Sequence, residues 1–402
     1  MNIFSKVTSI IFFGSITLSA VSLDSLIEVA LLKHPSLQVI KERIDSADKT
    51  VLLSRKLSNP KLTFSINDIQ LNDINNRSIE RMQSSAITLE QKLPYFGKLD
   101  SKEQGALANK EAQIFKLEET KSLLVSKIKH SAYRVWELTT LYSIICKFEE
   151  LTQQSIDLST AYTATTQNQH MGIMSATMNL SDLKIRKNRL LQAMQAQYAN
   201  LSYLSAKKVF DLEIELFMPK LTNLKELTKK LQNNFTIKAQ LSSVKEAKAL
   251  LVLRDLEAYP DPTIKTGYFY RNSYEDYLSF AVGITLPVYG SEKLKSQRQR
   301  KKLFESQSIL NNTERKIQSE LEAHYAYMRQ AHITYTILTK ESMPQIEHMF
   351  DLSSSSITVG GDLFKYIDLI KQELRLEEQR ISAVAEYYKH YASIEALLGV
   401  QK

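Results

Sequence analysis

Two parts of the chain alternate between apolar and polar side chains, and each is followed by a long stretch with helical spacing. The clearest alternation runs from Leu278 to Leu286, where large apolar side chains occupy every second position and small or hydroxyl-bearing ones stand between them. A period of two is typical of a strand that has one apolar face. Together these patterns predict two hairpins, at about 61–93 and 263–287, with strands near residues 61–69, 84–93, 263–270 and 277–287.

Helical spacing dominates the remainder of the chain. From Asp100 to about Thr165 there is no proline, and Gly105 is the only glycine, which predicts a helix far longer than the globular mean of about 11–12 residues. Further helices are expected at about 175–206, 293–353 and 363–398. Between them, Gly172 and Gly360 are expected in left-handed helix termini where the chain reverses.

The order helix, strand, strand, long helix, turn, long helix occurs twice. At an offset of 200 residues, Pro35, Leu37, Ala47 and Pro60 correspond to Phe235, Ile237, Ala247 and Pro260. We therefore predict a mainly α fold with a small β part and a two-fold internal repeat. The predicted segments are a signal peptide at 1–22, a first repeat at 23–206, a connector at 207–233 and a second repeat at 234–402.

The first 22 residues have the layout of a secretory signal peptide. Lys6 precedes an apolar run from Val7 to Ala20, and small residues stand before the expected cleavage site, so the mature chain is expected to begin at Leu23. No later run approaches the ~18 consecutive apolar residues of a transmembrane helix. Cys146 is the only cysteine, so an intramolecular disulfide is impossible.

Each predicted hairpin ends at a corner that contains a proline and, three residues later, a glycine. The first corner is Gln91–Leu99, with Pro94, Gly97 and Lys98, and the second is Ile284–Leu294, with Pro287 and Gly290. Proline cannot donate a hydrogen bond to a sheet and is confined to strand ends, edges and helix starts, while glycine permits a tight turn. Both segments therefore predict a change from strand to helix.

Composition and motifs argue against several function classes. The net charge is +8, but basic residues are spread along the helices and form no dense block with interleaved aromatics, so nucleic-acid binding is not expected. We find no glycine-rich phosphate loop, no Ser/His/Asp motif and no pair of histidines at metal-binding spacing. The sequence therefore predicts no enzyme, no cofactor and no metal site. The group His170, Met171, Met174 and Met178 has soft-ligand chemistry, but methionines at helical spacing are expected to pack.

Over its whole mature length, the chain resembles the TolC-type outer-membrane efflux and secretion channel family. The resemblance rests on the two corners and on the helix turns at 171–173 and 359–361. The Pro-x-x-Gly-Lys form of the first corner resembles the branch that serves heavy-metal and cation efflux. The resemblance implies a homotrimer with a shared 12-stranded β-barrel in the lipid of the outer membrane of a Gram-negative cell, joined to a periplasmic α-helical barrel. The connector would then join an equatorial belt.

The resemblance also implies a function and a set of sites. The channel would passively conduct substrates that an inner-membrane pump and a periplasmic adaptor protein deliver. Its tip, which would dock the adaptor, is expected to comprise His170, Met171, Gly172, Ile173, Thr358, Val359, Gly360 and Gly361. Asp362 and Asp368 are candidate pore-gate residues, because Tyr366 and Leu369 occupy the positions where the family often carries acidic rings.

Two alternatives stay open at this stage. The chain could serve as the outer-membrane duct of a type I protein secretion system, because the pump selects the cargo and the duct sequence does not. In a different class, it could be a soluble periplasmic coiled-coil structural protein, although the alternating strands and the repeated corners count against that interpretation.

Overall fold

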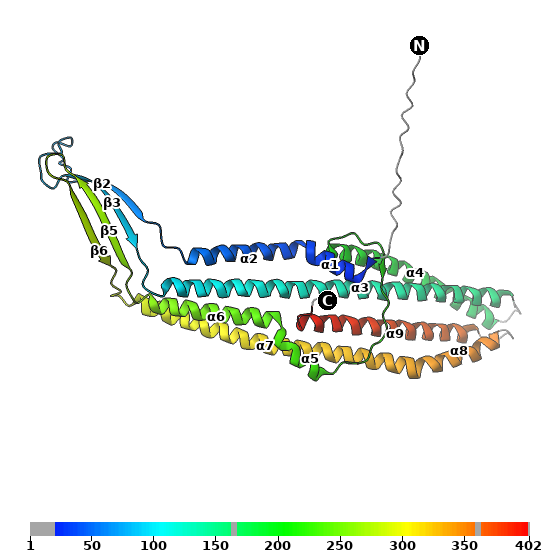
Figure 1. The fold of residues 1–402 in the computed structure, drawn as a ribbon. Helices are drawn as coiled ribbons and strands as arrows, with labels where there is room; N and C mark the ends of the chain where they lie inside the picture. The colour runs from blue at the N-terminus through cyan, green and yellow to red at the C-terminus, as the bar shows by residue number, and fades with distance from the viewer. Residues whose placement is uncertain (1–20, 162–166, 358–362, 401–402) are drawn as a thin grey trace, which may run out of the picture.

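A computed structural model describes residues 21–161, 167–357 and 363–400. Long helices run alongside one another and form an elongated body, and a four-stranded sheet extends from one end of it at an angle (Figure 1). The helices are α1 (Leu23–Lys33), α2 (Pro35–Ser54), α3 (Lys98–Ala161), α4 (Gln167–Ser205), α5 (Leu224–Lys230), α6 (Phe235–Leu256), α7 (Ser291–Ile337), α8 (Met343–Ile357) and α9 (Leu363–Leu397). The strands are β1 (Val21–Ser22), β2 (Lys61–Asn67), β3 (Ser84–Lys92), β4 (Leu212–Glu213), β5 (Pro262–Tyr270) and β6 (Tyr277–Ile284).

Helix α3 is the centre of the helical body, because it packs against α2, α4, α6 and α9. Its buried positions include several small residues, such as Ala108, Ala112 and Ala132, which allow neighbouring helices to approach. Apolar side chains form separate clusters along the body. One joins α1, α3 and α4 around Leu26 and Ile128, and another joins α3, α4 and α9 around Phe148 and Ile367.

The connector packs onto the second repeat. Leu227 of α5 lies in a third apolar cluster with residues of α7 and α9, including Leu321 and Tyr387. The Tyr388 hydroxyl donates to the Phe217 carbonyl at 2.9 Å, which ties the connector to α9. Strand β4 of the connector pairs in parallel with β1. The sequence pattern did not predict these strands, because each is only two residues long.

Val21 and Ser22, which we predicted as the end of the signal peptide, are part of this pairing, opposite Leu212 and Glu213. The Ser22 hydroxyl accepts a hydrogen bond from the Ser25 N–H and caps α1. Residues 1–20 lie outside the described residues, so the signal peptide stays a prediction.

Local sequence signals explain most helix boundaries. His34 ends α1 and Pro35 begins α2, where its missing N–H has no helical partner to lose. The predicted helix at 293–353 is confirmed in extent, but it is not α-helical throughout. A five-residue π turn, Leu338–Ser342, separates α7 from α8. Pro344 follows directly, and a proline that removes a helical hydrogen bond is an accepted cause of such a bulge.

The predicted reversal at 171–173 is wrong. Helix α4 begins at Gln167, so Gly172 lies inside the helix, and its φ is not in the left-handed region. A Cβ atom at Gly172 would stand 3.2 Å from the Cβ of Leu363, the first residue of α9. Glycine is therefore needed here for close helix packing and not for a turn. Gly360, in the second predicted turn, lies outside the described residues.

Candidate functional site

The two hairpins combine into one antiparallel sheet in the order β2-β3-β5-β6. The pairing of β3 with β5 joins the two halves of the chain. Across the sheet, Phe64 stands opposite Ile87, Ile87 opposite Tyr268, and Tyr268 opposite Leu278. Because directly opposite residues share a face, the register places the apolar positions of both hairpins on the same side.

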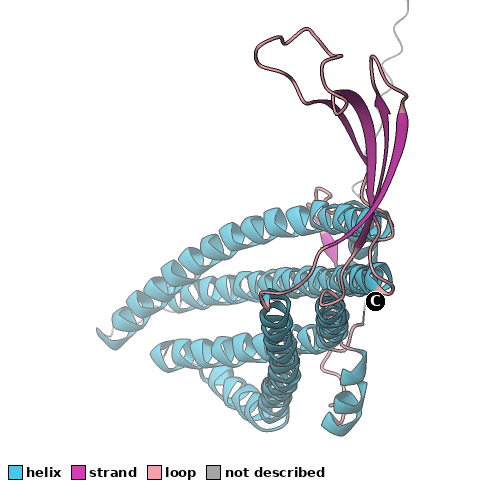
Figure 2. Cartoon of the chain, turned by 90° about the vertical axis from the view of Figure 1, so that its left-hand side faces the viewer, coloured by secondary structure: helices cyan, strands magenta, loops and turns pink. Residues whose placement is uncertain are grey.

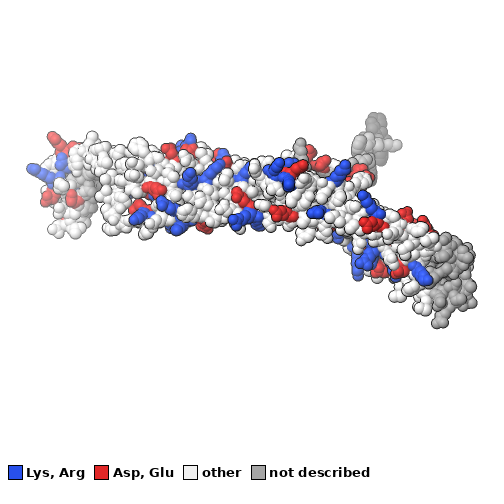
Figure 3. Space-filling view, turned by 90° about the horizontal axis from the view of Figure 1, so that it is seen from below, with Lys and Arg blue, Asp and Glu red and all other residues white. Residues whose placement is uncertain are grey.

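This apolar face is exposed to solvent in the single chain. Exposed fractions range from 43% at Leu89 to 78% at Leu278. Its exposed members are Leu62, Phe64, Ile66, Ile87, Leu89, Tyr268, Tyr270, Leu278, Phe280, Val282 and Ile284. Seen from below, the region over the strands carries no Lys, Arg, Asp or Glu between the charged loop end and the helices (Figure 3). A continuous apolar surface of this kind marks a membrane or protein contact.

Apart from the stacked rings of Phe269 and Tyr277, the opposite face of the sheet carries small, hydroxyl-bearing or charged side chains. Ser84, Ala86 and Thr88 are buried, and a Cβ atom at Gly267 would come within 2.7 Å of the Thr88 Cγ2. The four strands curve together as one strip above the helices (Figure 2), and the burial of these small residues puts them on the inside of the curve. The sheet therefore has an apolar outer face and a small or polar inner face.

Strands β2 and β6 form the two edges of this sheet, and within the described part of the chain neither has a second neighbour. An edge strand presents a row of unpaired backbone N–H and C=O groups that can pair with another strand. The apolar outer face therefore needs contact with lipid or protein, and the two open edges need further strands to pair with.

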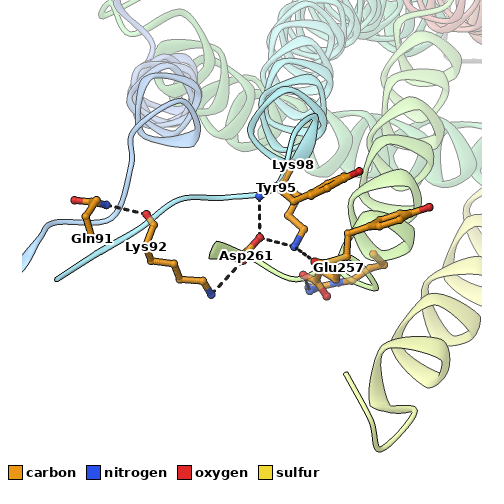
Figure 4. Close-up of polar contacts among 8 residues, drawn as sticks. Gln91, Lys92, Tyr95, Lys98, Glu257 and Asp261 are labelled. Carbon is orange, nitrogen blue, oxygen red and sulfur yellow. Dashed lines mark hydrogen bonds and ion pairs between the residues drawn. The ribbon is translucent and has the colours of Figure 1, made fainter. Parts of the chain in front are cut away.

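Asp261 holds the first corner in place (Figure 4). One carboxylate oxygen accepts from the Tyr95 N–H at 2.8 Å and from the Lys98 ammonium at 2.6 Å, while the other lies 3.1 Å from the Lys92 ammonium. Lys98 also donates to the Tyr259 carbonyl at 2.7 Å, and the Tyr95 and Tyr259 rings stack at 4.7 Å. A residue of the second half of the chain thus fixes the corner of the first.

The electrostatics of this cluster favour the charged carboxylate. Burial by itself would raise the pKa of Asp261, but the hydrogen bonds from Lys98, the Tyr95 N–H and Lys92 outweigh it, so the pKa lies below the usual value. The Lys98 and Asp261 side chains are only 10% and 17% exposed, so each is the main counter-charge of the other.

The second corner confirms the predicted turn but has no comparable cluster. Gly290 has φ of +69° and precedes α7, and the Val288 N–H donates to the Leu286 carbonyl at 3.0 Å. Val288 and Tyr289 are 70% and 94% exposed. Strand β6 ends at Ile284, so the predicted strand to residue 287 is too long, and Pro287 stands in the turn itself.

At the far end of the helices, some predicted tip and gate residues are exposed, some are packed, and some lie outside the described residues. His170 and Met171 are exposed on α4, Gly172 packs against α9, and Ile173 contacts the apolar cluster of α3, α4 and α9. Asp368 is exposed on α9 and accepts from the Gln372 side chain at 2.7 Å. Thr358, Val359, Gly360, Gly361 and Asp362 lie outside the described residues.

The ring positions of the predicted gate differ in their surroundings. Tyr366 is buried against Phe350 with ring centroids 5.0 Å apart, and Leu369 is half-buried. No helix in the described residues is long and apolar enough to cross a membrane. Within those same residues, no group of three His, Cys, Asp or Glu side chains is arranged to hold a metal ion.

Comparisons with known proteins identify this architecture. No family model and no curated protein matches the sequence. The outer-membrane channel MtrE of Neisseria gonorrhoeae superposes with a TM-score of 0.81 at 16% identity, over 94% of this chain and 89% of MtrE. The outer-membrane protein VceC of Vibrio cholerae gives 0.79 at 13% identity, over 94% and 96%. The outer-membrane channel CmeC of Campylobacter jejuni gives 0.74 at 12% identity, over 100% and 94%.

The chain has the fold of an outer-membrane channel. This result confirms the predicted combination of long helices and a small four-stranded sheet, and the matched proteins are channels rather than enzymes. At these identities the likeness concerns the fold alone.

Within this channel fold, sequence reasoning missed Asp261 and Tyr259. Two prolines flank Asp261, and by themselves they indicate only the end of a helix. Two features of the sequence could have indicated its role. Asp261 is a single carboxylate between two prolines at the start of a predicted strand, and the first corner carries two lysines, Lys92 and Lys98, that need a counter-charge. Only the pairing of β3 with β5 makes these residues neighbours.

Proposed function

We propose that the chain is the outer-membrane channel subunit of a tripartite efflux system. It passively conducts substrates that an inner-membrane pump delivers through a periplasmic adaptor protein. The observation that carries this proposal is the two-faced sheet, with an exposed apolar outer face, a small or polar inner face and two open edges. Transmembrane β-barrels alternate between lipid-facing apolar and lumen-facing polar residues in this way.

The open edges support assembly with further copies of the chain. Three copies, each with four strands, would close a 12-stranded barrel in which β6 of one chain pairs with β2 of the next. Closure removes every edge, which a sheet in lipid requires because no water is present to satisfy free backbone groups. The exposed apolar sheet counts against the soluble coiled-coil alternative, since such a protein has no use for it.

In this proposal the helical body extends into the periplasm. The far end of α4 and α9, with His170, Met171 and Ile173, would dock the adaptor together with residues 358–361. Asp368 is exposed there and would face the pore with Asp362 as the gate. Cysteine crosslinking from positions 170 and 171 to the adaptor tests the docking surface, and crosslinks only from mid-helix positions would contradict it.

Fractionation combined with gel electrophoresis without heating tests the proposal as a whole. We expect an outer-membrane protein that needs detergent for extraction and migrates as a trimer that heat dissociates. Phe280→Lys, on the outer face, should prevent stable insertion, because a lysine near the bilayer centre costs about 2–4 kcal/mol. Ser279→Lys, one residue away on the inner face, is the matched control and should still insert. A soluble periplasmic monomer would refute the proposal.

A further inference from the structure

Helices α7 and α9 bring two histidine rings into contact through their Nδ1 atoms, with the ring planes tilted by 43°. The Nδ1 atoms of His324 and His390 are 3.1 Å apart, and both side chains are half-buried. The second ring nitrogen of His390, Nε2, lies 3.6 Å from an Oε2 of Glu386, one turn earlier on α9. The Tyr327 ring stacks on the His390 ring at 4.9 Å and 17°. Each of these contacts fixes the orientation of the His390 imidazole.

The distance between the two Nδ1 atoms is close to that of two imidazoles that share one metal ion. Zinc binds imidazole nitrogen at about 2.0–2.1 Å, so two nitrogens at tetrahedral positions stand about 3.3 Å apart. Metal-binding histidines typically donate their other ring N–H to a carboxylate. Glu386 lies on that side of His390, at 3.6 Å, and is a carboxylate that could accept this N–H after a small shift. Imidazole suits Zn²⁺ and Cu²⁺ particularly well.

We propose that His324 and His390 form a binding site for one divalent transition-metal ion, Zn²⁺ or Cu²⁺, which links α7 to α9. Water completes the coordination, because the described residues offer no third His, Cys, Asp or Glu ligand there. The site goes beyond the proposed function and does not depend on it, since it concerns a resident ion in the helical body and not the transported substrate.

The protonation states are suited to this role. With Nε2–H of His390 directed toward Glu386, its Nδ1 accepts the hydrogen bond that the His324 Nδ1–H donates. Metal binding then requires only that the His324 proton moves from Nδ1 to Nε2, so both imidazoles stay neutral and no net proton is released. Burial lowers the pKa of both histidines, which favours their neutral forms.

The charges around the pair come from all three neighbouring helices. Burial has the largest effect on both pKa values and lowers them. Against it, Glu320 of α7 acts to raise the pKa of His324. On α9, Glu386 acts to raise the pKa of His390, while Lys389 acts to lower it. His130 of α3 is close enough to interact electrostatically with both. Two carboxylates and one ammonium therefore surround the pair, and this balance favours the positive charge of a divalent ion.

One of the two histidines lies at the surface of the helical body. His390 is 21% exposed and borders a surface pocket between α7 and α9 that Tyr327, Gln330 and Glu386 also line.

Isothermal titration with zinc chloride tests the proposal on the full chain, purified in detergent without a histidine tag. We expect one ion per chain and a rise in melting temperature with zinc. His324→Ala and His390→Ala should each abolish the zinc heat. His332→Ala is the matched control, because His332 also lies on α7 and faces Tyr387 of α9 at 6.3 Å between ring centroids. Glu386→Gln should weaken zinc binding by about tenfold.

Electron paramagnetic resonance with Cu²⁺ on the unmutated chain gives a readout that does not depend on the folding of any variant. We expect a signal with coupling to two nitrogens. Absence of that coupling, or a double variant His324→Ala/His390→Ala that binds zinc as tightly as the unmutated chain, would overturn the proposal.

Discussion

The corner after β3 and the corner after β6 share the same backbone plan, because each has a proline followed three residues later by a left-handed glycine. The φ angles are +81° at Gly97 and +69° at Gly290. Their surroundings differ. Lys98, directly after the first glycine, is buried in an ion pair, whereas Ser291, after the second, is exposed.

The position of each strand in the sheet explains this difference. Strand β3 is an inner strand with β5 beside it, so its corner meets Asp261 at the start of β5. Strand β6 is an edge, and all residues from Ala281 to Gly290 are exposed. A repeated sequence motif therefore sets the same backbone turn twice, but side-chain contacts form only where the sheet supplies a neighbour. In the proposed trimer, the next chain would supply the neighbour of the second corner.

The largest expected loss of stability comes from removing the charge that holds the first corner, Asp261. Asp261→Asn keeps an acceptor for the Tyr95 N–H but leaves the buried Lys98 ammonium without its counter-charge. Removing one partner of a buried pair costs about 3 kcal/mol or more. Denaturant unfolding of the purified protein measures this loss.

Two variants control that experiment. Glu292→Gln, beside the second corner, changes a carboxylate that is 20% exposed and has local partners, Ser291 and Lys295 of α7, so it should alter stability by less than about 1 kcal/mol. The double variant Lys98→Met/Asp261→Leu should recover much of the lost stability, because it removes both charges together. Equal losses for Asp261→Asn and Glu292→Gln would refute the distinction between the corners.

The pH dependence sharpens the same comparison. Because the pKa of Asp261 is lower in the folded chain, its contribution to stability is fully present above the unfolded value of about 3.9. That contribution is lost as the pH falls through the lower folded pKa. The stability difference between the unmutated chain and Asp261→Asn should therefore be constant from neutral pH to about pH 4 and shrink below it. Unfolding curves across this range test the direction, and a difference that grows with acid would contradict it.

Alanine at the two left-handed glycines tests what the corners share. Gly97→Ala and Gly290→Ala should each cost roughly 1–2 kcal/mol, because both force a side chain into the left-handed region. The nearest atom to an added Cβ is 3.4 Å away at Gly97, and none lies within 4 Å at Gly290, so neither variant adds a clash. Thermal unfolding should give similar losses, and a large difference would show that the backbone requirement is not shared.

The smallest expected effect concerns the glycines inside helices. Gly105→Ala should stabilise the chain by about 0.5–1 kcal/mol, because alanine is the better helix former and the new Cβ meets Leu250 at an ordinary 3.5 Å. Gly172→Ala should show no such gain, since its Cβ would press on Leu363 at 3.2 Å. A gain at Gly172 equal to that at Gly105 would mean that α4 and α9 separate easily at this end.

Much of the fold could be predicted from local patterns. Alternation located all four long strands to within a few residues, and the absence of proline and the presence of a single glycine predicted the length of α3. The corners at Pro94 and Pro287 were placed correctly because their chemistry is local. The tip was less predictable. Gly172 looked like a turn residue, but a glycine in a helix can equally serve close packing, and sequence spacing cannot distinguish the two uses.

By itself, the sequence determined which segments are helix and strand, which side of each strand is apolar, and that the plan occurs twice, because these properties depend on neighbours along the chain. Only the tertiary structure decided that β3 pairs with β5, that Asp261 meets Lys98 from 163 residues away, and that His324 faces His390. Those contacts depend on how separate elements pack and register against one another, and no local pattern encodes that arrangement.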